Sequence, residues 1–281
     1  MNFFDLHCDT PYECYLKNYD FSDPNLAVNE TGIQIFEEWY ECFAVFVKDG
    51  TEKPFDFYKA VYNNFIDKLP KSDNLHPIFT VEGGIVIERD ISRLETLKND
   101  GIKSLTLCWN GENAIAGGAD AESGIKAFGK DVIREMNRLN MACDLSHLNR
   151  RSFFDCAEIG ECIFASHSCC NHIFNHKRNL SDDQLKIIAE KKGVVGICLY
   201  PRFLGGDVFE KTYENICHLL DMGMEEYISI GSDFDGCEMP YELKSIVQIP
   251  DLYTFLIEKG IDKVILNKIF YENALKFFTK L

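Results

Sequence analysis

The sequence contains no long hydrophobic run and little positive charge. No stretch approaches the roughly 18 apolar residues that a membrane-spanning helix needs. The first residues, MNFFDLHCDT, lack both the basic region and the sustained apolar region of a signal peptide. The 29 Lys and Arg residues are outnumbered by 45 Asp and Glu residues, which gives a net charge of −16. Nucleic acids and anionic membranes are bound chiefly through Lys and Arg, so we expect neither as a partner.

Two common cysteine and glycine motifs are also missing. The 12 cysteines form no C-x-x-C pair and no regular spacing. Together with the lack of a signal peptide, this favours reduced thiols in a cytoplasmic protein over disulfides. No G-x-G-x-x-G follows an early strand, so a dinucleotide-binding domain is not expected. Apolar residues make up 46% of the 281 residues, which is enough for a large core.

What the sequence does contain is an alternation of short apolar segments with longer amphipathic ones. The segments with the length and composition of buried strands are 2–7, 42–47, 77–82, 104–109, 141–146, 162–167, 194–200 and 227–233. Helical spacing is found at 56–69, 125–140, 180–193 and 262–281. Strands that alternate with helices, at about 35 residues per unit, predict an α/β fold, a closed (β/α)8 TIM-type barrel. We expect this barrel to form a single catalytic domain over residues 1–281, with an open doubly wound sheet as the alternative.

Residues that can bind metal stand at the ends of several predicted strands. They are His7, Asp9, Glu82, His147, His167 and Asp233. The C-terminal ends of the strands form the active-site face of such a barrel, so we expect these side chains to converge. Three imidazoles and three carboxylates exceed the needs of one four-coordinate zinc ion and suit two ions that share a carboxylate. Glu82 is the best bridge, because the two glycines after it permit close approach. Nitrogen and oxygen ligands favour zinc, with manganese, iron or cobalt as alternatives.

The first predicted strand contains three adjacent residues that can bind metal. Side chains alternate between the two faces of a strand, so His7 and Asp9 are expected to point together into the barrel mouth. Cys8 is expected to point toward the helices, on the same side as Leu6 and Phe4. Asp5 is expected in the interior below His7. The pattern therefore predicts that Cys8 packs in the core and binds no metal.

In these motifs the chain resembles the membrane (renal-type) dipeptidases, metallopeptidase family M19, and in particular the bacterial members without a membrane anchor. The similarity extends from residue 5 to about 240. It rests on DLHCDT, VEGG, LTLCWNGEN, DLSH, SHS, KRNLSDDQL, KGVVGI and IGSDFDG, in that order. Each motif alone is weak, but their order on successive strand ends is specific. The resemblance implies a (β/α)8 barrel with two zinc ions that hydrolyses free dipeptides.

The resemblance also implies which residues hold the ions. His7 and Asp9 would bind one zinc ion, and His147 and His167 would bind the other. Glu82 would bridge both ions. The chain ends in LKFFTKL, which is a charged helix end and has no counterpart to the apolar anchor signal of some family members.

Catalytic and substrate-binding roles are implied in the same way. A hydroxide between the ions, held at Glu82, would attack the scissile carbonyl, and Asp233 would carry the proton to the leaving amine. Arg178 would bind the free carboxylate of the substrate, because its planar fork matches a carboxylate. Trp109 is a departure, since the mammalian-type members have a His there that contacts the scissile group. Trp109, Asn110 or Asn113 could donate a hydrogen bond instead, so we expect altered substrate preference rather than lost activity.

Other residues and other functions are weighed against this interpretation. His172 and His176 lack the glutamate of an H-E-x-x-H motif and are expected at the surface, with a loop role near the substrate as the alternative. His218 is expected to be structural. Asp235 is expected to shape a turn, and Asp144 either supports a ligand histidine or is purely structural. The alternative enzyme is another metal-dependent amidohydrolase, a deaminase or cyclic-amide hydrolase, although those usually begin with H-x-H. A binding protein on an inactive barrel is less favoured, because no expected ligand is missing. A homodimer is compatible with the sequence.

Overall fold

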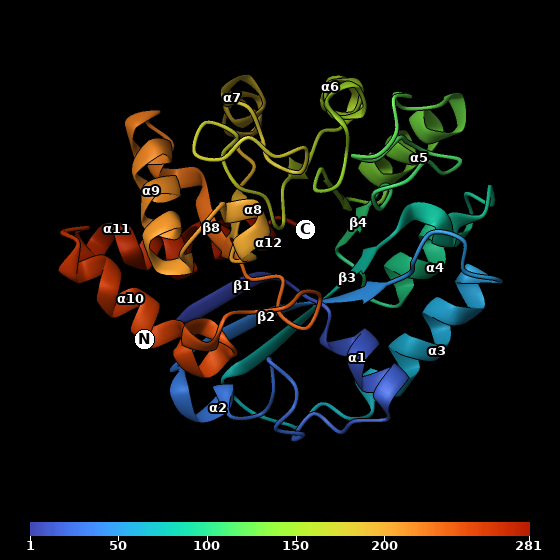
Figure 1. Cartoon of the computed structure of the whole chain (residues 1–281). Coiled ribbons are helices and arrows are strands. Elements are labelled where there is room, and N and C mark those ends of the chain that lie inside the picture. The colour runs from blue at the N-terminus through green and yellow to red at the C-terminus, as the bar shows by residue number, and fades with distance from the viewer.

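Eight parallel strands form one sheet surrounded by helices in the computed structural model, which describes residues 1–281 (Figure 1). The strands are β1 (Phe3–Cys8), β2 (Trp39–Phe46), β3 (Leu75–Glu82), β4 (Ser104–Thr106), β5 (Ala142–Asp144), β6 (Ile163–Phe164), β7 (Val195–Cys198) and β8 (Ile228–Gly231). Their order in the sheet is β6-β5-β4-β3-β2-β1-β8-β7. A parallel bridge from Ala165 to Val195 connects the two edges. All eight predicted strands are present, and the predicted barrel is confirmed.

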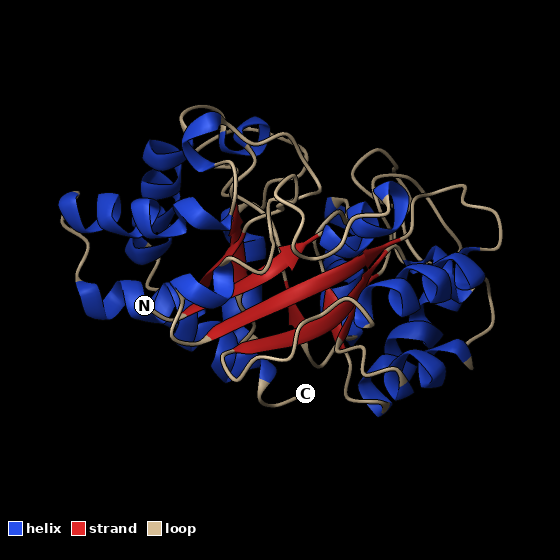
Figure 2. Ribbon diagram, turned by 90° about the horizontal axis from the view of Figure 1, so that it is seen from below, coloured by secondary structure: helices blue, strands red, loops and turns tan.

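The helices cover the outside of the strands (Figure 2). They are α1 (Thr10–Lys17), α2 (Gly32–Ile35), α3 (Pro54–Ile66), α4 (Arg93–Asn99), α5 (Ala127–Arg138), α6 (Arg150–Ile159), α7 (Asp182–Glu190), α8 (Pro201–Leu204), α9 (Val208–Asp221), α10 (Ile249–Glu258), α11 (Lys263–Asn267) and α12 (Asn273–Phe278). Ser181 and Gln184 form a capping box at the start of α7. The helix predicted over 262–281 is α11 and α12 joined by a π-helical turn. No helix has the length and apolar character needed to span a membrane.

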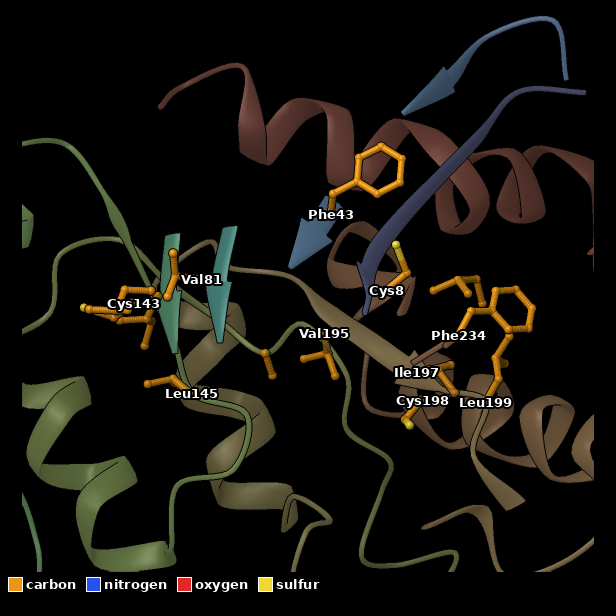
Figure 3. Packing of buried hydrophobic residues seen from close by; sticks show 14 of the residues in the cluster. Cys8, Phe43, Val81, Cys143, Leu145, Val195, Ile197, Cys198, Leu199 and Phe234 are labelled. Carbon is orange, nitrogen blue, oxygen red and sulfur yellow. The ribbon is translucent and has the colours of Figure 1, made fainter. Parts of the chain in front are cut away.

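The larger core lies between the strands and the surrounding helices. It contains Cys8, Phe43, Val81, Cys143 and Ile197, which Figure 3 shows together with neighbouring side chains of the same cluster. All five side chains are almost completely buried. Cys8 therefore packs among apolar side chains, as alternation along the first strand predicts.

A smaller core fills the barrel where the strands begin. It consists of Phe4, Leu6, Cys42, Ala142, Phe164, Val194, Ala274, Phe277 and Phe278. Strands that are not neighbours in the sheet contribute to this cluster, so it lies inside the barrel. Ring centroids of Phe164 and Phe277 are 5.2 Å apart, which places α12 against this end of the barrel. Phe4 and Leu6 are thus on the inner side, and the prediction that they share a side with Cys8 was wrong.

The reason is an irregularity in β1. Asp5 lies opposite Glu41 of β2, whereas Cys8 lies opposite Phe43, so three steps along β1 match two along β2. Such a β-bulge interrupts the alternation of side chains. Asp5 therefore shares the outer side with Glu41 and Phe43 and does not lie in the interior below His7, contrary to the prediction. The bulge allows Leu6 and His7 to lie on the inner side while Cys8 packs outward.

Candidate active site

Six side chains converge at the end of the barrel where the strands finish. They are His7, Asp9, Glu82, His147, His167 and Asp233, and each is more than nine-tenths buried. Each stands at the end of a strand or within three residues of it. His147 and Asp233 have φ angles of +70° and +64°, which turn the chain away from the strand direction at these two positions. The structure therefore brings together all the residues predicted from the strand ends.

The two carboxylate oxygens of Glu82 face different histidines. Oε1 is 2.7 Å from Nε2 of His147 and 4.0 Å from Nε2 of His167. Oε2 is 3.3 Å from Nε2 of His7. Nε2 of His7 is in turn 3.5 Å from Oδ2 of Asp9. Glu82 thus stands between two groups of donors, one on each of its oxygens, which is the position that a bridging carboxylate requires.

Hydrogen bonds behind His147 and His167 determine which ring nitrogens carry protons. Asn110 Oδ1 lies 2.9 Å from His147 Nδ1 and is an acceptor, so Nδ1 donates to it. Ser166 Oγ donates to Asp144 Oδ2 at 2.6 Å, so it accepts from His167 Nδ1 at 2.7 Å. Both Nε2 atoms therefore present lone pairs.

These two lone pairs face each other closely. The Nε2 atoms of His147 and His167 are 2.8 Å apart, and neither has a proton to share. Nε2 of His7 and Oδ1 of Asp9 are buried without a hydrogen-bond partner. Buried polar atoms are normally satisfied, so several unpaired polar atoms in one place indicate a ligand. The residues fit divalent metal ions, which take lone pairs from neutral imidazole and from carboxylate.

Burial and neighbouring charges shift the pKa values of this group. Burial, together with the positive charge of Arg178, lowers the pKa of His147 to about 4, so its ring is neutral at physiological pH. Burial would raise the pKa of Glu82, but the positive charge of His7 holds it well below its usual value. Burial raises the pKa of Asp233 to about 6. A neutral imidazole and an ionised central carboxylate are the protonation states that metal binding needs.

A cavity of about 430 Å³ opens over this group. Its base includes Asp9, Glu82, His147 and Asp233, and its aromatic walls are Tyr12, Phe46, Trp109, Tyr200 and Phe203. The rings of Phe46 and Trp109 are 5.4 Å apart between centroids. This volume is near the lower end of the range for small-molecule sites. Apart from Trp109, these aromatic residues were missed from the sequence, because they come from a strand end, helices and a loop with no common spacing.

The structure places the three predicted substrate-binding residues differently from one another. Trp109 and Asn110 both line the cavity, but the Asn110 side chain is also the hydrogen-bond partner of His147. Arg178 does not line this cavity. Its guanidinium lies over Phe203 of the cavity wall, 5.2 Å from the ring centroid, and Nη2 donates to the His167 carbonyl at 3.4 Å. Its Nε is buried without a partner, so part of the guanidinium is available to an anion.

Two of the acidic residues that were set aside have supporting positions. Asp144 accepts hydrogen bonds from Thr106 and Ser166, and through Ser166 it orients His167. Asp235 accepts from Thr10 and from the backbone amides of Ala27 and Val28, so it joins the loop after β8 to the segment that follows β1. Ser166 was missed, although its position directly before His167 is a usable signal for a supporting residue.

Comparison with known proteins identifies the family. The family described as Membrane dipeptidase (Peptidase family M19) matches residues 29–281. An uncharacterized dipeptidase of Schizosaccharomyces pombe is 31% identical over 215 residues, which cover 73% of this chain and 53% of that protein. The chain therefore spans about half the length of that relative.

Two solved structures are similar over nearly their whole length. The dipeptidase AC, a metallopeptidase of family M19, has a TM-score of 0.91 and 22% identity, over 100% of this chain and 98% of that one. A metallopeptidase from Rhodobacter sphaeroides was solved with a phosphinate mimic of the dipeptide L-Ala-D-Ala. It has a TM-score of 0.87 and 21% identity, over 100% of this chain and 99% of that one. At these identities the two structures show a shared fold, and the family match covers most of the chain. The chain therefore belongs to the membrane dipeptidase family of metallopeptidases, peptidase family M19.

Proposed function

We propose that this protein is a zinc-dependent dipeptidase with two metal ions at the barrel mouth, and that residues 1–281 act as one catalytic domain. The observation that carries the proposal is the position of Glu82, whose two oxygens face separate groups of donors. His7 and Asp9 would hold one ion, and His147 and His167 the other. The donors are nitrogen and oxygen atoms only, which favours zinc among the common divalent ions.

The chemistry follows from what the ions supply and what the protein contributes. Metal ions held by these residues would supply Lewis-acid activation of a water molecule at neutral pH and of the scissile carbonyl. Glu82, between the two groups of donors, would fix the position of the attacking oxygen. Asp233, whose pKa is raised by burial to about 6, can accept and return a proton near neutral pH, so it would protonate the leaving amine.

The cavity supports a small substrate with a free carboxylate. Its volume of about 430 Å³ suits a dipeptide. Arg178, buried behind the wall formed by Phe203, would bind the substrate carboxylate through the part of its guanidinium that has no partner. Trp109 would donate its indole N–H to the carbonyl oxygen or to the developing oxyanion. The R. sphaeroides relative was solved with a dipeptide mimic, which supports the same substrate class here.

Metal analysis and a substrate panel test the proposal together. We expect about two zinc ions at the barrel mouth, and cleavage of free dipeptides but not of N-blocked dipeptides or tripeptides. The panel should include a D-residue at the second position. Release of ammonia, or opening of cyclic amides without dipeptide cleavage, would instead identify the protein as another amidohydrolase.

A matched pair of variants tests the role of Trp109. Trp109→Phe keeps an aromatic wall and removes the N–H donor, whereas Trp109→Ala removes both. If the N–H stabilises the oxyanion, Trp109→Phe should lower kcat about 10²-fold with both metals retained. Unchanged kinetics of both variants on every dipeptide would refute this role.

A further inference from the structure

A second group of metal-binding residues lies outside the barrel mouth. His172 comes from the segment between β6 and α7, Asp182 is the first residue of α7, and His218 lies in the last turn of α9. One donor atom from each lies within 4.8 Å of the other two. None of the three belongs to the site around Glu82. The fold therefore brings them together from three separate parts of the chain.

The geometry of this group is close to that of a metal site. Nε2 of His218 and Oδ1 of Asp182 are 2.9 Å apart. Two donors on one tetrahedral zinc ion, with bonds of ~2.0–2.1 Å, lie about 3.3 Å apart. Separating the two atoms by a few tenths of an ångström would therefore admit an ion between them.

His172 can supply the third donor. Its ring lies nearly parallel to that of His218, with centroids 4.3 Å apart and an angle of 10° between the planes. His172 is exposed and makes no hydrogen bond, so little opposes a rotation of its ring toward the shared position. His218 and Asp182 are both partly exposed, so an ion can enter from solvent.

We propose that His172, Asp182 and His218 form a third, peripheral site for a divalent transition-metal ion, with water completing the coordination. Two imidazoles and one carboxylate are a common donor set for zinc and related ions. The net charge of −16 further favours cations near the protein surface.

An ion at this site would connect particular elements. His172 and Asp182 bracket the segment that carries Arg178, and His218 belongs to α9. The ion would therefore fasten both ends of that segment to α9. This consequence concerns the position of the segment and is independent of whether the barrel mouth cleaves dipeptides.

Zinc titration of single variants tests the proposal. Full-length protein is stripped with a chelator, titrated with Zn²⁺ alone, and followed by calorimetry, with bound zinc counted by mass spectrometry. Wild type should bind one zinc ion more than His172→Ala or His218→Ala does. If the variants still bind the same number of ions, the weakest-bound ion should have at least a tenfold lower Kd in wild type than in either variant. His76→Ala is the matched control, because His76 is also partly exposed and bonded to a carboxylate, that of Glu38, but has no second histidine donor.

The result for this peripheral site can be told apart from metal binding at the barrel mouth. The prediction concerns a difference of one ion between wild type and variant, whatever the total. Equal zinc binding by wild type, His172→Ala and His218→Ala would overturn the proposal, as would an equal loss in His76→Ala. His172 is exposed, so replacing it should leave the fold intact, and circular dichroism of His172→Ala checks this point.

Discussion

The hydrogen bond from His167 to Ser166 provides a sharp test of the metal centre. Ser166→Ala removes the acceptor at 2.7 Å from Nδ1 of His167, so the ring no longer has a fixed proton position or orientation. Residues that support a ligand histidine in this way typically contribute 10–100-fold to metal affinity or activity. That range corresponds to about 1.4–2.7 kcal/mol. We expect a loss of this size in zinc affinity.

Ser146 offers a matched control in the same place. Ser146 Oγ accepts from the backbone N–H of His167 at 3.1 Å and lies 3.2 Å from Ser166 Oγ, but it does not touch the imidazole. Both serines are buried. Ser146→Ala should therefore cost a similar amount of stability, about 1 kcal/mol for one hydrogen bond, while leaving zinc affinity nearly unchanged.

Competition with a chelator of known zinc affinity measures the difference. Ser166→Ala should release one ion at a chelator concentration 10–100-fold lower than wild type or Ser146→Ala does. Its kcat/KM at subsaturating zinc should fall in parallel and recover when zinc is added. If the two alanine variants hold zinc equally well, the chain from Asp144 through Ser166 does not orient His167, and the reasoning is refuted.

Three further predictions concern the first strand, the packing inside the barrel and a buried carboxylate. Cys8→Ala should retain both proposed active-site metal ions and Asp9→Ala should lose one, as measured by metal content after dialysis. The reason is that Cys8 packs in the outer core whereas Asp9 lies beside His7. Loss of an ion from Cys8→Ala would contradict this assignment. Gly231→Ala should destabilise the fold by about 3 kcal/mol in thermal unfolding, because a Cβ there would lie 1.7 Å from the Ser166 carbonyl oxygen. Gly206→Ala is the control and should change stability little, because its Cβ would meet only the flexible Lys211 side chain. Burial, followed by the charge of Asp5, raises the pKa of Glu41 well above its usual value. Above about pH 4.5 the folded protein therefore keeps a proton on Glu41 that the unfolded chain releases. The free energy of unfolding of wild type consequently falls as pH rises above about 4.5. Glu41→Gln cannot lose this proton, so its free energy of unfolding minus that of wild type should grow between pH 5 and pH 8, by at most about 1.4 kcal/mol per pH unit. A difference independent of pH would refute the assignment.

The barrel and the convergence of the metal-binding residues could be predicted because each depends on a general rule. Eight apolar segments alternate with amphipathic ones, and parallel strands present their C-terminal ends on one face. His7, Glu82 and Asp233 are far apart in sequence, yet that rule alone places them at one end of the barrel. No knowledge of side-chain conformation is needed for this step.

The details that could not be predicted depend on local geometry. The bulge in β1 moves Leu6 inward and Asp5 outward, and nothing in the residues 3–8 distinguishes a bulged strand from a regular one. Asn110 was expected to face a substrate, but its side chain bonds to His147 as well. Such a choice depends on rotamers and on which partner lies within reach, and neither follows from spacing along the chain.

The shape of the metal site also depends on two glycines that carry no chemistry. A Cβ on Gly196 or Gly231 would lie within about 2 Å of the Ser166 carbonyl oxygen, so these glycines allow the end of β6 to approach β7 and β8 closely. Ser168 N–H donates to the Gly196 carbonyl at 2.8 Å and holds the chain there. Because this segment lies so far inward, the ring of His167 comes within 4.0 Å of the ring of His7, although their strands are not neighbours in the sheet. Closure of the barrel between β6 and β7 and the position of His167 thus depend on the same close approach. A substitution that widens this side should separate the two groups of donors on Glu82.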